Sequence, residues 1–338
     1  MIAFRHKAEP VTIQPGGRWK AKEAGGETYR DTPADELGRI VEEVNAGEPW
    51  RACVQRHYAG SKPWLCRIVT DPCRDLFFRQ YPPRPGSLVL DIGAGWGQLA
   101  LPLARTCTVA AVEPTPERLD FIAAAARQDG VSDRISFIEA DFLALEFDTR
   151  FDLVCCIGVL EWVPKFRAGP AREVQLDFLS RIRGLLAPGG QLVIGIENRL
   201  GLKYILGVPD DHIGLPVIAV LEAEAARRHY LAATGKELRS FTYSHEEYHR
   251  LLAEAGFTGV KAYAAFPDYK LPELILPADE TLESALAGPA AMPPEHNGAD
   301  GSILSAAMQE TLASHYRSLA KAGISRFFAP SYFLVAGS

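Results

Sequence analysis

Short apolar runs alternate with amphipathic segments between residues 87 and 196, and this alternation predicts the fold. The runs at 87–91, 107–113, 135–141, 151–158 and 191–196 have the length and composition of buried parallel strands. Between them, 116–128 and 173–186 carry apolar residues at helical spacing, and 98–105 begins like a helix. Strands that alternate with helices predict an α/β protein with a doubly wound, mostly parallel sheet.

The pattern changes on both sides of this stretch. Residues 1–30 are polar and predict an irregular arm, 33–46 predicts a helix, and the aromatic-rich stretch 50–82 predicts a helical cap or lid. We therefore expect an arm and cap at 1–82 and a core at 83–338. Insertions at about 197–240 and 268–325 interrupt that core. Strands at 258–266 and 327–336 bring the sheet to seven, and Ser244 with Glu247 predicts a capping box before a helix at 246–255.

Asp91 ends the first sheet strand, and three glycines follow it at alternate positions. Gly93, Gly95 and Gly97 predict a tight turn that lets backbone N–H groups and a helix N-terminus approach a ligand, because no Cβ intervenes. Open α/β sheets bind their ligands at this carboxyl edge. The turn is therefore a candidate nucleotide-cofactor site. It lacks the G-x-G-x-x-G spacing that is typical of nicotinamide cofactors.

Composition narrows the choice of partners. The net charge of −6 and the absence of a Lys/Arg run argue against nucleic acid. The six cysteines form no C-x-x-C pair, so no metal centre or disulfide framework is expected. No apolar run approaches the roughly 20 residues of a membrane span, and the N-terminus has no signal-peptide core. We expect a cytoplasmic protein.

The segment Asp91–Gly97 resembles the D-x-G-x-G-x-G motif of class I S-adenosylmethionine (SAM) methyltransferases, and the element order from 87 to 196 is similar to theirs. This resemblance implies a Rossmann-like fold and SAM as the cofactor. Glu113 ends the second strand, where an acid binds both ribose hydroxyls, unless it is simply a solvated strand end.

The resemblance implies further donor contacts. Asp141 is expected to accept the adenine amino group. Phe142 would lie beside the ring or belong to the core, and Asp91 would face the methionine ammonium. Glu161 and Trp162, after the fourth strand, either contact donor or acceptor or serve in capping and packing. The expected cofactor-binding residues are Asp91, Gly93, Ala94, Gly95, Trp96, Gly97, Glu113, Pro114, Asp141, Phe142, Ile157 and Gly158.

The fourth-strand segment also excludes some acceptors. It lacks the motifs of methyltransferases that act on nucleobases, and Cys155-Cys156 stands where metal-dependent catechol-type enzymes have acids. Neither a nucleobase acceptor nor a metal is therefore expected.

The stretch Glu197-Asn198-Arg199-Leu200-Gly201-Leu202-Lys203-Tyr204 leaves the carboxyl end of the fifth strand and is unusually polar for a loop. Together with Asp210–Gly214 and Phe266–Pro272, it resembles a subgroup found with bacterial surface-polysaccharide and glycan enzymes. This resemblance implies a sugar or another small polar molecule as acceptor. The candidate contacts, each equally consistent with bracing of the loop, are Asn198, Arg199, Lys203, Tyr204, Asp268 and Tyr269.

Methyl transfer to oxygen is an in-line displacement, and an aliphatic hydroxyl needs a base to take its proton. His212 is the candidate base, with Asp211 orienting its ring, although both could merely brace the loop. His245 and His249 lie on one helix face and are expected to have a surface role.

The favoured reaction is O-methylation of a sugar or small metabolite. Two alternatives remain. One is a SAM-consuming cyclase or aminoalkyl transferase that releases methylthioadenosine, and the other is a SAM-binding partner subunit without turnover.

Overall fold

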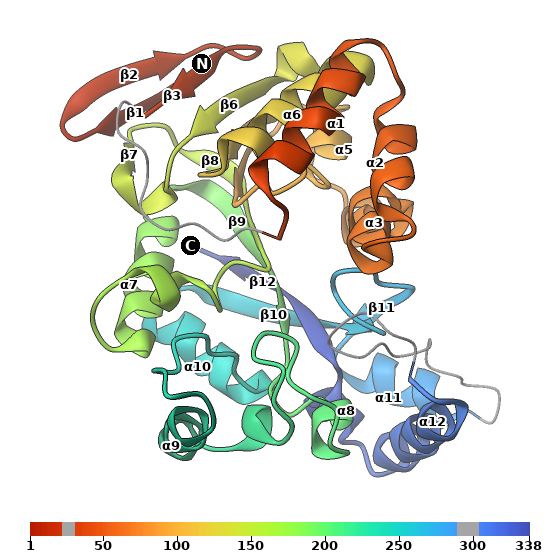
Figure 1. The fold of residues 1–338 in the computed structure, drawn as a ribbon. Coiled ribbons are helices and arrows are strands. Elements are labelled where there is room, and N and C mark those ends of the chain that lie inside the picture. Colours follow the sequence, from red (N-terminus) through yellow and green to blue (C-terminus); the bar gives the residue numbers. More distant parts are fainter. Residues whose placement is uncertain (22–30, 289–303) are drawn as a thin grey trace. The chain divides into compact units, whose positions relative to one another are not determined.

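The computed structural model describes residues 1–21, 31–288 and 304–338, and the chain divides into two compact units (Figure 1). Unit 1 comprises residues 1–157, 181–193 and 337–338, and unit 2 comprises 158–180 and 194–336. Strand β9 (Leu186–Glu197) contributes to both units. The described strands include nine that hydrogen-bond in the order β11-β10-β12-β9-β8-β4-β5-β6-β3. The expected α/β class is confirmed. The expected count of seven strands is wrong, because β3 and β11 add an edge strand at either end.

Unit 1 contains the predicted parallel strands β4, β5, β6 and β8, together with β3, which the sequence did not predict. β4 pairs in parallel with β5 and β8, and β6 pairs in parallel with β5 and β3. Their apolar residues are buried on both faces, as continuous hydrophobic runs require; Val89 and Val109 are fully buried. The strands are β3 (Arg18–Lys20), β4 (Leu88–Ile92), β5 (Thr108–Val112), β6 (Ile135–Glu139) and β8 (Phe151–Ile157).

Helices α1, α2 and α5 of unit 1 pack against α6 (Pro116–Gln128), and α3 in turn packs against α2 (Figure 1). Gln128 fixes this packing, since its side-chain amide donates to the carbonyl oxygens of Val44 and Glu48 at 2.9 and 2.7 Å. Trp50 contacts the ring of Phe121 edge-on at 5.8 Å. The helices are α1 (Ala34–Asn45), α2 (Trp50–Tyr58), α3 (Pro63–Thr70), α4 (Leu76–Gln80) and the short α5 (Ala100–Leu103).

The expected irregular arm is wrong for residues 1–20, and 22–30 lie outside the described residues. β1 (Ile2–His6) pairs antiparallel with β2 (Glu9–Ile13) and with β7 (Leu145–Phe147). Phe4 packs against Phe147 with ring centroids 5.5 Å apart. The strand is therefore stabilised by a partner distant in sequence, which local polarity does not reveal.

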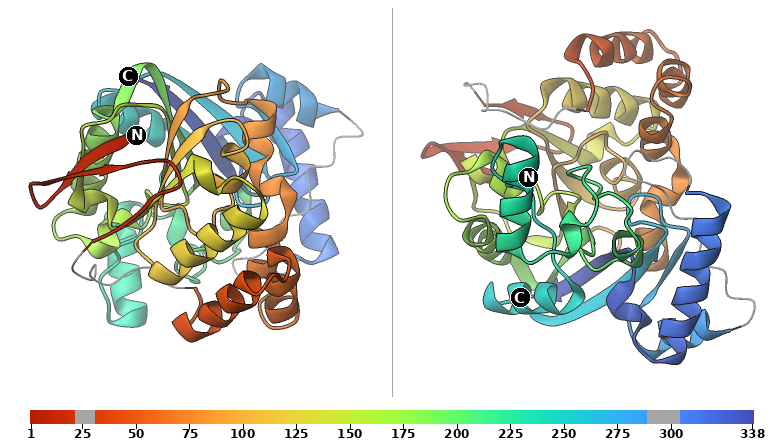
Figure 2. Two further views of the ribbon diagram at one scale, coloured as in Figure 1. Left: turned by 90° about the horizontal axis from the view of Figure 1, so that it is seen from above. Right: turned by 60° about the horizontal axis from the view of Figure 1, so that its bottom comes forward.

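Unit 2 contains the last part of the sheet and most of the later helices. The capping box of Ser244 and Glu247 at α10 is confirmed. Figure 2 shows α11 and α12 side by side. The elements are α8 (Leu202–Ile205), α9 (Ala223–Thr234), α10 (His245–Glu254), β10 (Thr258–Phe266), β11 (Leu274–Pro277), α11 (Glu280–Ala287), α12 (Ala306–Lys321) and β12 (Ser331–Gly337), while α7 (Ala171–Arg183) is shared with unit 1.

Two expectations about these later elements are wrong. Residues 268–288 are not irregular throughout, since β11 pairs antiparallel with β10 and α11 follows it; 289–303 lie outside the described residues. The helix expected at 173–186 is also wrong at its end, because α7 ends at Arg183 and Pro188–Gly190 already lies within β9. A Cβ on Gly190 would lie 2.7 Å from the carbonyl oxygen of Phe151, so glycine is needed there for a close backbone approach.

No helix in the described ranges is both long and apolar enough to cross a bilayer.

Candidate functional site

The turn after β4 has the backbone shape that its glycines predict. Gly93, Gly95 and Gly97 have φ values of 68°, 57° and 77°. The N–H groups of Gly93 and Ala94 donate to the carbonyl of Val112 at 2.9 and 3.1 Å, and that of Gly97 donates to Ala94 at 2.8 Å. These N–H groups are thus used within the protein, contrary to the expectation that they face a ligand. The helix that follows, α5, has only four residues, which is too short for a helix dipole that would attract a ligand.

Glu113 lies directly after β5 and its side chain turns back to this glycine turn. Its Oε2 accepts the N–H of Gly95 and its Oε1 the N–H of Thr115, both at 2.9 Å. The residue is 2% exposed, and burial raises the pKa of its carboxyl group, although the charge of Arg118 opposes this. A carboxylate offers about four acceptor positions. Two are occupied, and the ribose role of Glu113 stays a prediction.

Asp91 has an unsatisfied acceptor at the same turn. The residue is 3% exposed, and its Oδ2 has no hydrogen-bond partner among the described residues. Burial raises the pKa of its carboxyl group to about 7; the charge of Glu113 adds to this effect, and that of Arg74 opposes it. Buried polar atoms are normally hydrogen-bonded, so this orphan oxygen fits a ligand that brings a donor. The amino group of SAM is such a donor, and the residues present therefore fit the cofactor.

Other predicted donor contacts have structural partners. The Trp96 indole packs against Tyr58 and Phe121 at 5.9 and 5.1 Å. Phe142 stacks on Phe147 at 6.3 Å, as its core alternative predicts. Asp141 accepts the backbone N–H of Leu143 at 2.9 Å. Pro114 lies beside Glu113, Ile157 ends β8, and Gly158 begins unit 2. Direct donor contacts by these residues stay predictions.

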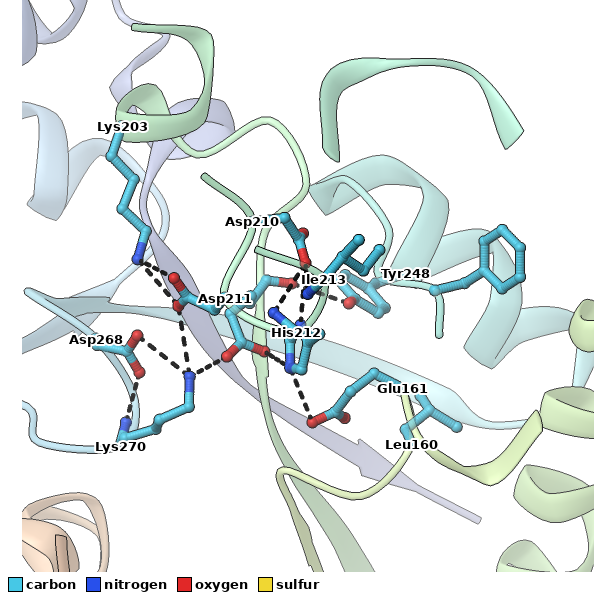
Figure 3. Close-up of polar contacts among 12 residues, drawn as sticks. Leu160, Glu161, Lys203, Asp210, Asp211, His212, Ile213, Tyr248, Asp268 and Lys270 are labelled. Carbon is cyan, nitrogen blue, oxygen red and sulfur yellow. Dashed lines mark hydrogen bonds and ion pairs between the residues drawn. The ribbon is translucent and has the colours of Figure 1, made fainter. Parts of the chain in front are cut away.

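Unit 2 has a buried ionic cluster around His212 (Figure 3). His212 Nε2 lies 3.5 Å from Glu161 Oε1 and 3.4 Å from Glu197 Oε2, and its Nδ1 lies 3.8 Å from Asp210 Oδ1. Glu161 follows β8 and Glu197 is the last residue of β9. Their side chains are 0% and 1% exposed, and that of His212 is 5% exposed. The ring of Trp162 lies 5.1 Å from that of His212.

The other half of the cluster contains two lysines. Lys203 Nζ donates to both carboxylate oxygens of Asp211 at 3.0 Å. Lys270 Nζ donates to Glu197 Oε1 and lies 3.5 Å from carboxylate oxygens of both Asp211 and Asp268 (Figure 3). Asp211 is buried, yet Lys203 and Lys270 hold the pKa of its carboxyl group well below its usual value.

The expected pairing of Asp211 with His212 is wrong, because Asp211 binds Lys203 instead. The carboxylates nearest to His212 are those of Glu161, Glu197 and Asp210. Burial alone would lower the pKa of His212, but the charges of these three acids raise it to about 10. The ring therefore holds its proton at neutral pH and cannot accept a second one, which argues against His212 as the general base.

Comparison with known proteins identifies the segment around the glycine turn. Residues 89–190 match a family described as a methyltransferase domain. The chain contains a methyltransferase domain. S-adenosylmethionine is the cofactor of this domain, which belongs to the class I SAM-dependent methyltransferases.

Among curated proteins, the chain is similar to a ubiquinone biosynthesis O-methyltransferase of Rickettsia felis, 28% identical over 121 residues that are 36% of this chain and 45% of the relative. The similarly named protein of a Caulobacter species is 31% identical over 160 residues, 41% of this chain and 60% of the relative. The chain thus spans about half the length of the curated relatives it matches. Among solved structures, a putative O-methyltransferase from Nostoc punctiforme is 16% identical and covers 69% of this chain and 68% of its own, with a TM-score of 0.43.

Several acceptor contacts predicted outside the methyltransferase domain have bracing roles. The Asn198 amide donates to the carbonyls of Phe327 and Ala329 at 2.9 and 2.8 Å, and its Oδ1 accepts the N–H of Leu200 at 3.0 Å. Arg199 forms a two-pronged ion pair with Glu247 at 2.7 and 3.0 Å. Their polar atoms are thus engaged within unit 2, as the bracing alternative predicts.

The remaining candidates lie at or near the cluster. Asp268 accepts the backbone N–H of Lys270 at 2.7 Å. Tyr204 is 2% exposed, and its hydroxyl has no hydrogen-bond partner in the described part of the chain. Tyr269 is also 2% exposed, and its hydroxyl lies 2.8 Å from where a Cβ of Gly158 would be.

Sequence reasoning left Glu197 and Lys270 out of the candidate site, although both stand in the motifs that suggested the acceptor. The signal for Glu197 was available. It is an acid at the carboxyl end of a sheet strand, as Glu113 and Asp141 are.

Proposed function

We propose that this chain is a SAM-dependent O-methyltransferase that acts on a hydroxyl group of a small polar molecule such as a sugar. The methyltransferase domain and the O-methyltransferase relatives support the reaction. The observation that carries the acceptor class is the Glu161 side chain. It is fully buried, and neither carboxylate oxygen has a hydrogen-bond partner in the described residues. Leaving such a group unsatisfied costs about 1–3 kcal/mol or more.

An unsatisfied carboxylate oxygen needs a hydrogen-bond donor, and the hydroxyl groups of an acceptor can supply it. Glu161 Oε1 and Oε2 and Glu197 Oε2 are all buried without a hydrogen-bond partner among the described residues. The hydroxyl groups of a bound sugar could each donate to one of these oxygens, and attack on the sulfonium methyl requires that the attacking hydroxyl lose its proton. We assign acceptor recognition to this cluster and donor binding to the glycine turn, with Asp91 and Glu113 as its acidic residues.

The names of the curated relatives favour a second acceptor, a phenolic hydroxyl of a quinone precursor. A phenol has a pKa of about 10, so it loses its proton far more readily than an aliphatic alcohol and depends less on a general base. These relatives match about two fifths of the chain, so their acceptor is a separate candidate for the experiment below.

The deciding experiment incubates the purified chain with methyl-labelled SAM and two acceptor pools. One pool contains sugars, nucleotide sugars and other water-soluble metabolites, and the other contains hydroxylated and dihydroxylated phenols with quinone-like substitution. We expect label in the first pool, S-adenosylhomocysteine as co-product, and loss of both with Glu161→Gln. Label in the phenol pool alone would replace the sugar by a quinone precursor. Methylthioadenosine as the co-product, or SAM binding without labelling of either pool, would overturn the proposed methyl transfer.

A further inference from the structure

Two sets of side chains in the described part of unit 2 have the composition and spacing of metal ligands. One set is Glu161, Glu197 and His212, and the other is Glu197, Asp211 and Asp268; within each set the ligand atoms lie within 4.8 Å of one another. The second set is already neutralised, because the Lys203 and Lys270 ammonium groups bind its carboxylates. The first set differs from the second in that each of its three residues has an unused ligand atom.

Those unused atoms belong to all three residues of the first set. Both Glu161 oxygens, Glu197 Oε2 and His212 Nε2 are buried, and none has a hydrogen-bond partner among residues 1–21, 31–288 and 304–338. Lys270 binds the other oxygen of Glu197, Oε1, which leaves Oε2 directed to the histidine. An unsatisfied, fully buried carboxylate beside an unsatisfied imidazole nitrogen is costly unless something binds there.

The spacing of these atoms matches a coordination sphere. Ligand atoms that each lie about 2.1 Å from one ion, at a tetrahedral angle, are about 3.4 Å apart. His212 Nε2 lies 3.5 Å from Glu161 Oε1 and 3.4 Å from Glu197 Oε2. These distances exceed the usual N–H···O hydrogen-bond length of about 2.9 Å, so the three side chains are within ion-pair distance of each other without being hydrogen-bonded.

We propose that Glu161, Glu197 and His212 bind one divalent transition-metal ion, with Mn²⁺ and Zn²⁺ as the matching ions. One imidazole and two carboxylates favour these ions over Mg²⁺ and Ca²⁺, which prefer oxygen ligands alone. Asp210 supports the histidine from behind, since its Oδ1 lies 3.8 Å from Nδ1 and is held by the backbone N–H groups of His212 and Ile213 at 2.9 and 3.0 Å.

The charge balance of the cluster agrees with a bound cation. It contains five acids and three basic groups, an excess of two acids over bases (5 − 3) even with the histidine protonated. The acids are Glu161, Glu197, Asp210, Asp211 and Asp268, and the bases are Lys203, Lys270 and His212. A divalent ion would offset this excess of negative charge in a buried site.

The role of this ion rests on the proposed function, whereas its binding does not. With the ion on Glu161 Oε1 and Glu197 Oε2, the acceptor contact at this cluster would be a hydroxyl on Glu161 Oε2 or on the ion itself. An ion with three protein ligands keeps open positions for an acceptor hydroxyl, and a hydroxyl bound to a metal ion loses its proton more readily. This would supply the deprotonation that methyl transfer to an aliphatic hydroxyl requires.

The test measures ion binding by the purified full-length chain after treatment with a chelator. Mn²⁺ is titrated and its free concentration followed by electron paramagnetic resonance, and Zn²⁺ retained after dialysis is counted by elemental analysis. We expect one ion per chain and a loss of affinity of at least about tenfold in Glu161→Gln and in His212→Gln. The matched control is His249→Gln, because His249 also lies in unit 2 but belongs to neither ligand set and packs against His245, with ring centroids 4.6 Å apart. This control should bind the ion like the wild type.

Three outcomes would overturn the metal site: no ion bound by the wild type, equal affinity in all variants, or loss of the ion in His249→Gln alone. Thermal unfolding of each variant without metal shows whether the chain still folds. If Glu161→Gln fails to fold, Glu161→Asp, which keeps a carboxylate but shortens its reach, should still bind the ion with reduced affinity. Methyl transfer by the metal-free protein refutes the catalytic role of the ion alone, and ion binding without methyl transfer to any acceptor refutes the proposed function alone.

Discussion

The backbone N–H of Gly95 donates to Glu113 Oε2 over 2.9 Å, which joins the glycine turn after β4 to the end of β5. The same carboxylate accepts the N–H of Thr115 through its other oxygen. Glu113 thus shapes the turn, in addition to the ribose contact that we predict for it. A substitution at this position should separate the two roles if the replacement keeps the hydrogen-bond acceptor but loses the charge.

Glu113→Ala should weaken SAM binding by about 1–3 kcal/mol, because it removes charge-assisted hydrogen bonds and leaves the N–H of Gly95 without its partner. Glu113→Gln keeps an acceptor for Gly95 and should bind SAM with intermediate affinity. Isothermal titration calorimetry measures both variants. Glu146→Gln on β7 is the control, since its side chain is 61% exposed and lies in the same unit. Unchanged affinity in Glu113→Ala would remove the residue from the ribose role.

SAM affinity should fall as the pH drops below about 7, because Asp91 binds the methionine ammonium only when it is ionised and burial raises its pKa to about 7. Asp91→Asn should bind SAM weakly and with little dependence on pH between 5.5 and 8.5. The free protein should show the opposite trend. Its Asp91 keeps a proton that the unfolded chain releases near pH 3.8, so its stability falls as the pH rises from about 4 to 7.

Asp91→Asn should therefore raise the unfolding midpoint of the free protein at pH 8 while it lowers SAM affinity. Calorimetric titrations at several pH values and thermal unfolding of both proteins test this pair of effects. A flat affinity profile in the wild-type protein would show that Asp91 does not meet the ammonium.

Asn198→Ala should destabilise the fold by about 2–4 kcal/mol and leave SAM affinity within about twofold of the wild type. The substitution leaves the buried carbonyls of Phe327 and Ala329 and the N–H of Leu200 without partners. Denaturant unfolding gives the stability, and Asn45→Ala at the exposed end of α1 is the control. Full stability combined with lost methyl transfer would instead favour the acceptor contact first predicted for Asn198.

The donor half of the protein could be predicted from sequence because its signals are local. A buried strand that ends on Asp91, a glycine turn and a second strand that ends before Glu113 are all visible in short stretches, and the structure contains both strands. What the sequence does not reveal is how the turn uses its N–H groups, because their acceptor, the carbonyl of Val112, comes from another strand.

For the acceptor half, the sequence predicted which segments form the site but not which of their side chains face a ligand. Polar residues such as Asn198 and Asp211 can either face a ligand or brace their own loop, and the choice depends on partners far away in the chain. Asp211 binds Lys203. The sequence spacing alone could not show whether Asp211 pairs with Lys203 or with the adjacent His212. The three proposed metal ligands come from separate segments of the chain, so no motif of fixed spacing predicts them.

Gly158→Ala should destabilise the protein more than a change of backbone conformation alone explains. Its φ is 69°, and a Cβ there would lie 2.8 Å from the Tyr269 hydroxyl oxygen. Gly130 has a nearly identical φ of 70° with no heavy atom within 4 Å of the Cβ position, so Gly130→Ala measures the left-handed strain by itself, about 1–2 kcal/mol.

We expect Gly158→Ala to cost about 1–2 kcal/mol more than Gly130→Ala, because the added methyl group overpacks a buried site. Tyr269→Phe removes the oxygen that the methyl group would meet, so the double variant should recover most of this excess. Denaturant unfolding of the wild type, both single variants and the double variant gives the coupling energy between the two positions. If that coupling is zero, the tyrosine hydroxyl is not what requires glycine here, and a contact of Gly158 with the bound cofactor becomes the better explanation.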